Sequence, residues 1–326
     1  MFRLMMEKTI HYIKKNNFHM NQIDECYKKV KNDCFKFINL QETKKNKFKN
    51  KNNMLKSYLI PLSFWIKKKL KKKSPIIIGL SGGQGTGKTT TTSIISLILR
   101  KYFKLKVFKI SIDDFYKTRK DRKKLSISKH PLLITRGVPG THDYRIIYKF
   151  FKKIKNKKFS KLRLPKFDKS KDDRCHKNLW YKINSRPDVI IFEGWCVGAK
   201  AQKNSELVRP INLLEKTEDP DLVWRNYVNI QLKTHYKKLF KQINEIIYLR
   251  VNNFKMLQKW RIKQEKILWL KSKNKRNLRI MNRGDIINFM QTYQRITQSM
   301  FKDAPKYASI VMKLNSNHQI NSIKFR

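Results

Sequence analysis

Short apolar runs recur along the chain after residue 75, and each has the composition of a buried strand. Runs of Ile, Val, Leu and Phe occupy residues 76–80, 107–112, 189–192, 246–249 and 310–312. Stretches with helical spacing lie between them, and one continues from the end of the first run to about residue 103. Strands buried on both faces that alternate with helices indicate a parallel sheet. The pattern predicts an α/β fold with its ligand site at the carboxyl ends of the strands.

Two other parts of the chain lack strand-like runs. Residues 1–73 are polar and rich in Lys and Asn, with weak helical spacing at residues 6–13 and 58–66. Residues 254–300 have helical spacing that is broken by Asn- and Lys-rich residues near 273–277. We interpret residues 1–73 as a basic, mostly helical N-terminal extension and residues 74–326 as the α/β domain.

Composition adds a strong positive charge to this picture. The chain has 326 residues, 40% of them hydrophobic, and a formal net charge of +54. A core of useful size can be buried, and such a charge would ordinarily indicate nucleic acid. Lysine is nevertheless spread over nearly every segment, and no strip rich in Arg and aromatic residues marks one face. We interpret the charge as compositional bias and do not expect nucleic acid as a partner, although a nucleic-acid-stimulated ATPase stays open as an alternative.

Cysteine spacing and hydropathy indicate the compartment. The cysteines at positions 26, 34, 175 and 196 show no C-x-x-C spacing, so neither a zinc site nor a disulfide framework is indicated. No uninterrupted apolar segment is long enough to cross a bilayer, and the N-terminus lacks the apolar centre of a signal peptide. We therefore expect a cytoplasmic protein without a membrane partner.

The first apolar run leads directly into a phosphate-binding motif. Residues 82–89 read G-G-Q-G-T-G-K-T, which fits G-x-x-x-x-G-K-[ST] between a predicted strand and a predicted helix. Glycines let successive N–H groups converge on a phosphate at the positive end of the helix dipole. Lys88 would reach the β- and γ-phosphates and Thr89 would hold Mg²⁺. The predicted nucleotide-binding residues are Gly82, Gly83, Gln84, Gly85, Thr86, Gly87, Lys88, Thr89 and Thr90.

Acidic residues follow two other predicted strands. Asp113 and Asp114 come directly after the run 107–112, and Glu193 closes the run 189–192. Phosphoryl transfer to an alcohol needs a carboxylate near the acceptor hydroxyl and others near Mg²⁺. A capping role at a strand end is the structural alternative for the Asp pair. Glu193 beside a phosphate loop is placed to reach Mg²⁺ through water.

Two loop-like segments are dense in groups that bind small anions. Residues 136–143 read R-G-V-P-G-T-H-D, and residues 164–174 contain Phe-Asp-Lys-Ser followed by Asp-Asp-Arg. Arg forms bidentate pairs with carboxylates and phosphates, and Lys acts as a point charge. For His142 a structural role and a direct substrate contact stay equally open. The substrate-binding candidates are Asp114, Tyr116, Arg136, Gly140, His142, Asp143, Asp168, Lys169 and Arg174.

Together with W-R-N-Y-V-N at 224–229 and W-R-I-K-Q-E at 260–265, these motifs resemble the D-glycerate 3-kinase family of P-loop kinases. That family is related to uridine kinase, phosphoribulokinase and bacterial pantothenate kinase, and the similarity spans roughly residues 55–320. The resemblance implies a three-layer α/β/α P-loop NTPase fold with a helical lid over about residues 254–285. It also implies transfer of the ATP γ-phosphoryl group to the 3-hydroxyl of D-glycerate, a small-molecule substrate.

The resemblance also implies roles for single residues. Lys88, Asp113 and Glu193 would be catalytic, with Asp113 as the base, and Thr89, Asp114 and Glu193 would lie near the metal. Arginines of the lid would close over the phosphates, the candidates being Arg261, Arg279 and Arg283. Gly83 departs from the family, where proline is frequent, and so does the short spacing between Ser170 and Asp173. A uridine or pantothenate kinase and a non-catalytic homologue are the alternatives, and the intact Lys88 and Asp113 argue against the second.

Overall fold

The computed structural model describes residues 20–43, 47–71, 74–156, 159–271 and 281–326. In this part of the chain, a six-stranded sheet has the order β10-β9-β8-β1-β7-β2. Its strands are β1 (Ile76–Gly82), β2 (Val107–Ser111), β7 (Val189–Gly194), β8 (Glu245–Arg250), β9 (Ile310–Leu314) and β10 (Ile320–Phe325). Neighbouring strands run parallel except for β10, which is antiparallel to β9. The predicted α/β fold with a mostly parallel sheet is confirmed.

Each of the five predicted apolar runs is a strand of this sheet, because its side chains alternate between two apolar layers. On β1, Ile76, Ile78 and Leu80 belong to one buried cluster, whereas Ile77 belongs to the other. β1 lies in the middle, paired with β7 on one side and β8 on the other. This position puts the carboxyl ends of β1, β7 and β2 next to one another, where the predicted site residues follow.

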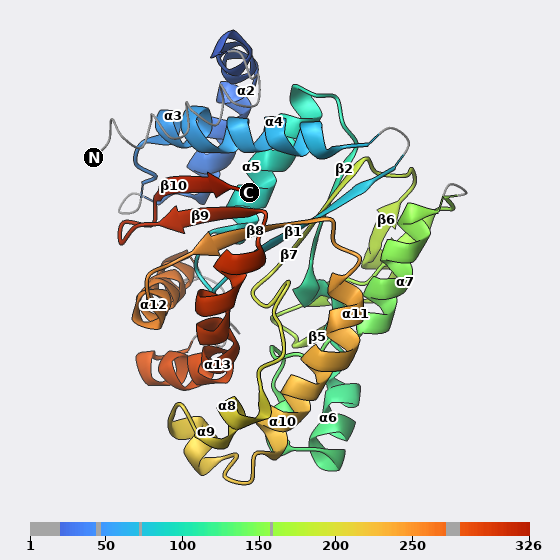
Figure 1. Cartoon of the computed structure of the whole chain (residues 1–326), viewed down its shortest axis with the longest axis vertical. Coiled ribbons are helices and arrows are strands. Elements are labelled where there is room, and N and C mark those ends of the chain that lie inside the picture. Colours follow the sequence, from blue (N-terminus) through green and yellow to red (C-terminus); the bar gives the residue numbers. More distant parts are fainter. Residues whose placement is uncertain (1–19, 44–46, 72–73, 157–158, 272–280) are drawn as a thin grey trace.

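Helices cover both faces of the sheet (Figure 1). The N-terminal helices α2 (Met20–Gln41), α3 (Lys51–Asn53) and α4 (Ile60–Lys69) lie on the same face as α5 (Lys88–Lys101). The other face carries α7 (Tyr144–Lys155), α10 (Val223–Gln231), α11 (Lys237–Phe240) and α13 (Arg283–Tyr307). The remaining helices are α6 (Arg119–Ser128), α8 (Asn204–Val208), α9 (Leu213–Thr217) and α12 (Phe254–Lys271). The result is the expected three-layer α/β/α arrangement.

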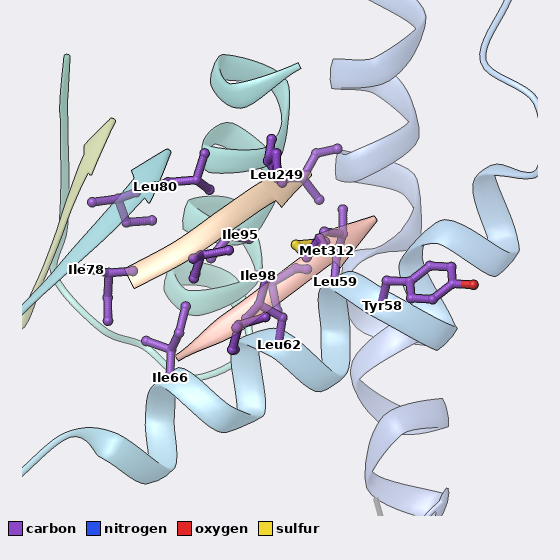
Figure 2. Close-up of a cluster of buried hydrophobic side chains, with 14 of the residues drawn as sticks. Tyr58, Leu59, Leu62, Ile66, Ile78, Leu80, Ile95, Ile98, Leu249 and Met312 are labelled. Carbon is purple, nitrogen blue, oxygen red and sulfur yellow. The ribbon is translucent and has the colours of Figure 1, made fainter. Parts of the chain in front are cut away.

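The N-terminal helices share the core of the sheet. Figure 2 shows Leu59, Leu62 and Ile66 packed toward the sheet and toward α5 side chains such as Ile98. The helical spacing at residues 58–66 therefore predicted α4, which a π-helical turn, Met54–Leu59, precedes. The boundary after residue 73 stays a prediction, and the spacing at residues 6–13 lies outside the described residues.

The sequence did not indicate α2, although it is 22 residues long. Lysines and other polar residues separate its buried positions, Ile23, Cys26, Val30, Cys34 and Ile38, which lie in one narrow stripe. The interpretation of residues 164–174 as loop is wrong in part. Two short antiparallel pairs join β3 (Leu162–Leu164) to β6 (Tyr181–Ile183) and β4 (Phe167–Asp168) to β5 (Asp173–Arg174). Strands of two or three residues are too short to produce a periodic pattern.

The break predicted near residues 273–277 lies outside the described residues. On either side of it, α12 and α13 confirm the helical spacing of residues 254–300. Among the residues that the structure describes, no helix combines the length and the apolar character that crossing a membrane would require.

Candidate active site

The phosphate-binding motif forms a turn between β1 and α5. Gly85 and Gly87 have φ of +79° and +83°, a backbone conformation that favours glycine. Gly87 is the N-cap of α5 and provides no side-chain cap, so the first N–H groups of the helix stay available to an anion. Lys88 Nζ donates to the carbonyls of Gly82 at 2.9 Å and Gly83 at 3.0 Å, which bends the lysine back over the turn. The geometry is that of a phosphate cradle.

Helix α12, which the sequence predicts as part of a lid, lies directly against this turn. A Cβ at Gly83 would be 2.3 Å from Leu257 Cδ1, and a Cβ at Gly85 would be 3.0 Å from Trp260 Cβ. A side chain at position 83 would therefore have to displace the buried side chain of Leu257. This close packing accounts for glycine at the position where proline is frequent in the family that the sequence resembles.

Glu193 faces the same turn from the end of β7. Its Oε1 accepts a hydrogen bond from Thr89 Oγ1 at 3.0 Å, and its buried Oε2 has no partner among the described residues. Burial raises the pKa of Glu193, against the opposing charge of Lys88. A carboxylate and a Thr hydroxyl suit Mg²⁺, which takes one or two protein ligands and keeps waters and phosphates as the others. In the described residues no group of three His, Cys, Asp or Glu side chains could hold a metal by itself.

Asp113 lies in a 3₁₀ turn, Ile112–Phe115, that Ser111 caps. Its Oδ2 accepts from Lys169 Nζ at 2.7 Å, and its Oδ1 accepts from the Tyr116 hydroxyl at 3.0 Å. Burial alone would raise the pKa of Asp113, but the Lys169 ammonium and the Tyr116 hydroxyl hold it below its usual value. Burial lowers the pKa of Lys88, and the negative charges of Glu193 and Asp113 oppose this shift. The predicted catalytic residues are thus brought together at one edge of the sheet.

Asp114 points to a different segment. Its carboxylate accepts from the Phe167 backbone N–H at 3.4 Å and from the Tyr181 hydroxyl at 3.3 Å, which ties the 3₁₀ turn to β4 and β6. Burial raises the pKa of Asp114 to about 6. These contacts give Asp114 a positioning role, and its assignment as a substrate or metal ligand stays a prediction.

His142 is fully buried next to this turn. Its Nδ1 is hydrogen-bonded to the Tyr236 hydroxyl at 2.7 Å, and that hydroxyl also accepts from the Gly140 N–H at 3.1 Å. No other described residue accepts the hydroxyl hydrogen of Tyr236, so we assign this hydrogen to Nδ1 and the imidazole proton to Nε2. Nε2 is buried without a partner among the described residues, and the ring stacks on Tyr116 at 4.4 Å between centroids. Burial lowers the pKa of His142 to about 4, so the ring is neutral at neutral pH.

Comparisons with known proteins agree with this geometry. Residues 77–206 match the model of the phosphoribulokinase/uridine kinase family. An uncharacterized kinase of Schizosaccharomyces pombe is 31% identical over 215 residues, covering 64% of this chain and 76% of the relative. A chloroplastic D-glycerate 3-kinase of Arabidopsis thaliana is 28% identical over 227 residues, but the match covers only 47% of that longer protein. A D-glycerate 3-kinase structure from Cryptococcus neoformans has the same fold, with a TM-score of 0.68 over 82% of this chain and 96% of the other at 23% identity.

The chain belongs to the phosphoribulokinase/uridine kinase family. It is therefore a P-loop kinase, and the matched segment contains Lys88, Asp113, His142, Lys169 and Glu193. The family match ends before the lid candidates. Among these, Arg261 pairs with Glu265 on α12, Arg283 is exposed at the start of α13, and Arg279 lies outside the described residues. Which arginine meets the phosphates of the nucleotide stays a prediction.

The arginines predicted to bind the acceptor of this kinase have acidic partners within the protein. Arg136 pairs with Asp172, and Asp172 also pairs with the buried Arg122 at 2.9 Å. Arg174 Nη2 lies 3.3 Å from Asp143 Oδ2, and Arg174 Nε donates to the Tyr116 carbonyl at 2.7 Å. These pairs fasten the loops around Asp113. They also leave Lys169, Tyr116 and His142 as the predicted substrate contacts that interact with the Asp113 carboxylate.

Sequence reasoning missed the tyrosines that support the site of this kinase. Tyr236 holds Gly140 and His142, and Tyr181 holds Asp114. Tyr293 of α13 lies against Gly137, where a Cβ would be 2.3 Å from its hydroxyl oxygen, and packs edge-on against Trp195. All three lie far from their partners in the sequence and in no recognisable motif. No local signal could have found them.

Proposed function

We propose that this kinase transfers the γ-phosphoryl group of ATP to a hydroxyl of a small anionic alcohol, and that D-glycerate is the acceptor. The observation that carries the proposal is the position of the Asp113 carboxylate. It is bonded to a largely exposed lysine, Lys169, and it is close enough to Lys88 of the phosphate cradle to act on its pKa. A base near both a phosphate cradle and a largely exposed cation suits a hydroxyl acceptor that carries its own negative charge.

In this proposal the acceptor hydroxyl passes its proton to Asp113. The hydroxyl oxygen forms a bond to the γ-phosphorus as the bond from that phosphorus to the β,γ-bridging oxygen breaks, and ADP leaves. The N–H groups at the start of α5 and the Lys88 ammonium bind the phosphate oxygens and stabilise their charge in the transition state. Mg²⁺, when bound, would neutralise phosphate charge, and Thr89 with Glu193 would hold it.

Two features support an anionic acceptor. The neutral His142 lies beside Asp113 with a buried Nε2 that has no partner among the described residues, and a buried donor is favoured only when an acceptor atom meets it. Lys169 supplies a cation at the same place. The choice of D-glycerate rests on the motifs of the chain and on the name of the Arabidopsis relative.

Purified protein assayed with ATP and Mg²⁺ against D-glycerate, uridine, pantothenate and ribulose 5-phosphate tests the proposal. We expect D-glycerate to be phosphorylated with the highest kcat/KM. A Lys88→Ala variant is the control, because it removes charge from the phosphate cradle, and its transfer should fall by several orders of magnitude. Absence of D-glycerate phosphorylation by the wild-type protein would reject this acceptor, and near-normal transfer by Lys88→Ala would reject the role of the cradle.

A further inference from the structure

The fold places the side chain of Lys169 next to Asp113, although the two residues are 56 positions apart in the sequence. It lies in the turn between β4 and β5, and this turn is fastened to the segment that follows Asp113. Arg174 Nε donates to the Tyr116 carbonyl at 2.7 Å, and the Arg119 N–H donates to Asp173 Oδ1 at 3.1 Å. The side chain of Arg122, which is fully buried, donates to the Asp172 carbonyl at 2.6 Å. These contacts fix the turn so that the side chain of Lys169 reaches Asp113.

The turn itself is closed by its own residues. Asp168 Oδ1 accepts from the Ser170 N–H at 2.9 Å and from Ser170 Oγ at 2.5 Å. Phe167 packs edge-on against Tyr116, with 5.2 Å between the ring centroids. A rigid turn fixes the Cα of Lys169 and leaves the long side chain as the part that can move.

In the ion pair between Lys169 and Asp113, the lysine is exposed to solvent and the aspartate is largely covered. The side chain of Lys169 is 62% exposed, whereas that of Asp113 is 26% exposed. A largely exposed ammonium can exchange one carboxylate for another at little cost, because an exposed ion pair has a small net stability. Asp113 must lose this cation before it can act as an effective base, since a carboxylate paired with a cation is a weaker proton acceptor.

We propose that Lys169 is an anion-operated switch for Asp113. The negative group of the acceptor draws the Lys169 ammonium away from Asp113, and the carboxylate then takes the proton of the acceptor hydroxyl. A neutral alcohol cannot make this exchange, so Asp113 stays paired and transfer is slow. Water cannot make it either, and the switch thereby limits ATP hydrolysis when no acceptor is bound. The inference rests on the proposed function, because it names the group that selects the acceptor at that site.

Matched pairs of acceptors test the switch. D-glycerate and glycerol differ in charge, as do pantothenate and pantothenol, and each pair keeps the reacting primary alcohol. For the pair whose anion the wild-type protein phosphorylates, we expect the ratio of kcat/KM, anion over neutral alcohol, to fall in Lys169→Met by roughly tenfold to a hundredfold, as loss of a charge-assisted bond predicts. Lys171→Met is the control, because Lys171 is exposed in the same turn and its side chain has no ion pair among the described residues. Its ratio should stay at the wild-type value.

Hydrolysis of ATP without any acceptor gives a second measurement that is independent of the acceptor's identity. Lys169→Met frees Asp113 from its cation, so we expect hydrolysis several times faster than in the wild-type protein and in Lys171→Met. Unchanged or slower hydrolysis would overturn the switch, and so would equal losses of kcat/KM for the anion and its neutral counterpart. Preference of the wild-type protein for a neutral acceptor such as uridine would also overturn it. If D-glycerate is not phosphorylated but pantothenate is, the choice of acceptor fails while the switch is still tested with the pantothenate pair.

Discussion

The hydroxyl of Tyr236 offers a sharp test of how the site is supported. Tyr236→Phe removes one oxygen from a fully buried side chain and leaves the ring in place. Two groups lose their partner, the Gly140 N–H at 3.1 Å and His142 Nδ1 at 2.7 Å. A buried polar group without a partner costs about 1–3 kcal/mol, so the free energy of unfolding should fall by roughly 2–6 kcal/mol. Such a loss exceeds that of most single substitutions.

The same change should act on catalysis in a selective way. Without the hydroxyl, the His142 ring can carry its proton on Nδ1, and Nε2 then no longer donates to the acceptor. We expect KM for the acceptor to rise by about fivefold or more, as loss of roughly 1 kcal/mol of binding predicts, while KM for ATP stays close to the wild-type value.

Urea unfolding and steady-state kinetics measure these two effects. Tyr227→Phe is the matched control, because Tyr227 also lies against Gly140 but its hydroxyl has no hydrogen bond among the described residues. Its free energy of unfolding should change by less than about 0.5 kcal/mol. If Tyr236→Phe is no less stable than Tyr227→Phe, the hydroxyl does not support the site, and equal rises in KM for acceptor and ATP would show a general loss of structure.

Three other predictions follow from the same site. Asp113→Asn should lower kcat by about 10²- to 10⁴-fold with little change in ATP affinity, and comparable losses in both would reassign Asp113 to structure or metal binding. Gly83→Ala should lower the free energy of unfolding by about 1–3 kcal/mol, because its Cβ meets Leu257. In urea unfolding, the double variant with Leu257→Ala should lose less free energy of unfolding than the two single variants lose in sum. Burial lowers the pKa of His142 to about 4 from 6.5, so its contribution to stability is complete above pH 6.5 and is lost as the pH falls toward 4. Urea unfolding at pH 7.5 and at pH 5 measures this contribution. Over that interval the free energy of unfolding of the wild-type protein should fall by about 2 kcal/mol more than that of His142→Gln. Comparing the two proteins cancels the opposite contribution of Asp114, whose pKa is raised and which both proteins contain.

Local patterns predicted the sheet and the edge at which chemistry occurs. β1, β2, β7, β8 and β9 each contain a run of apolar residues because both faces of these strands are covered, and that burial is visible in any short window of sequence. The phosphate cradle is also local, since the residues that shape it are consecutive. Asp113 and Glu193 could be assigned to the same edge because the strands that precede them are parallel.

Contacts between distant segments could not be predicted in this way. Tyr236 is one of 13 tyrosines in the chain and ends a π-helical turn, Leu232–Tyr236, with no motif around it. Its partner His142 was equally compatible with a structural role and a substrate contact, and only its buried, unpartnered Nε2 favours the second. β10 was not predicted for another reason. Its residues are only partly buried at the edge of the sheet, so they do not form an apolar run.

The net charge of +54 says little about how an anionic acceptor would be recognised. Among the described residues, Lys88 and Lys169 share the site with Asp113 and Glu193, and the nearby Arg136 and Arg174 are paired with Asp172 and Asp143. The site thus has no large surplus of positive charge, although the chain as a whole does. In the proposed switch, a carboxylate that enters this site replaces Asp113 as the partner of Lys169. The long-range field of the many other lysines is screened within about 10 Å at ordinary salt. Selectivity for an anion then depends on which single cation can change partners, and this is why the position of Lys169 matters more than the number of lysines.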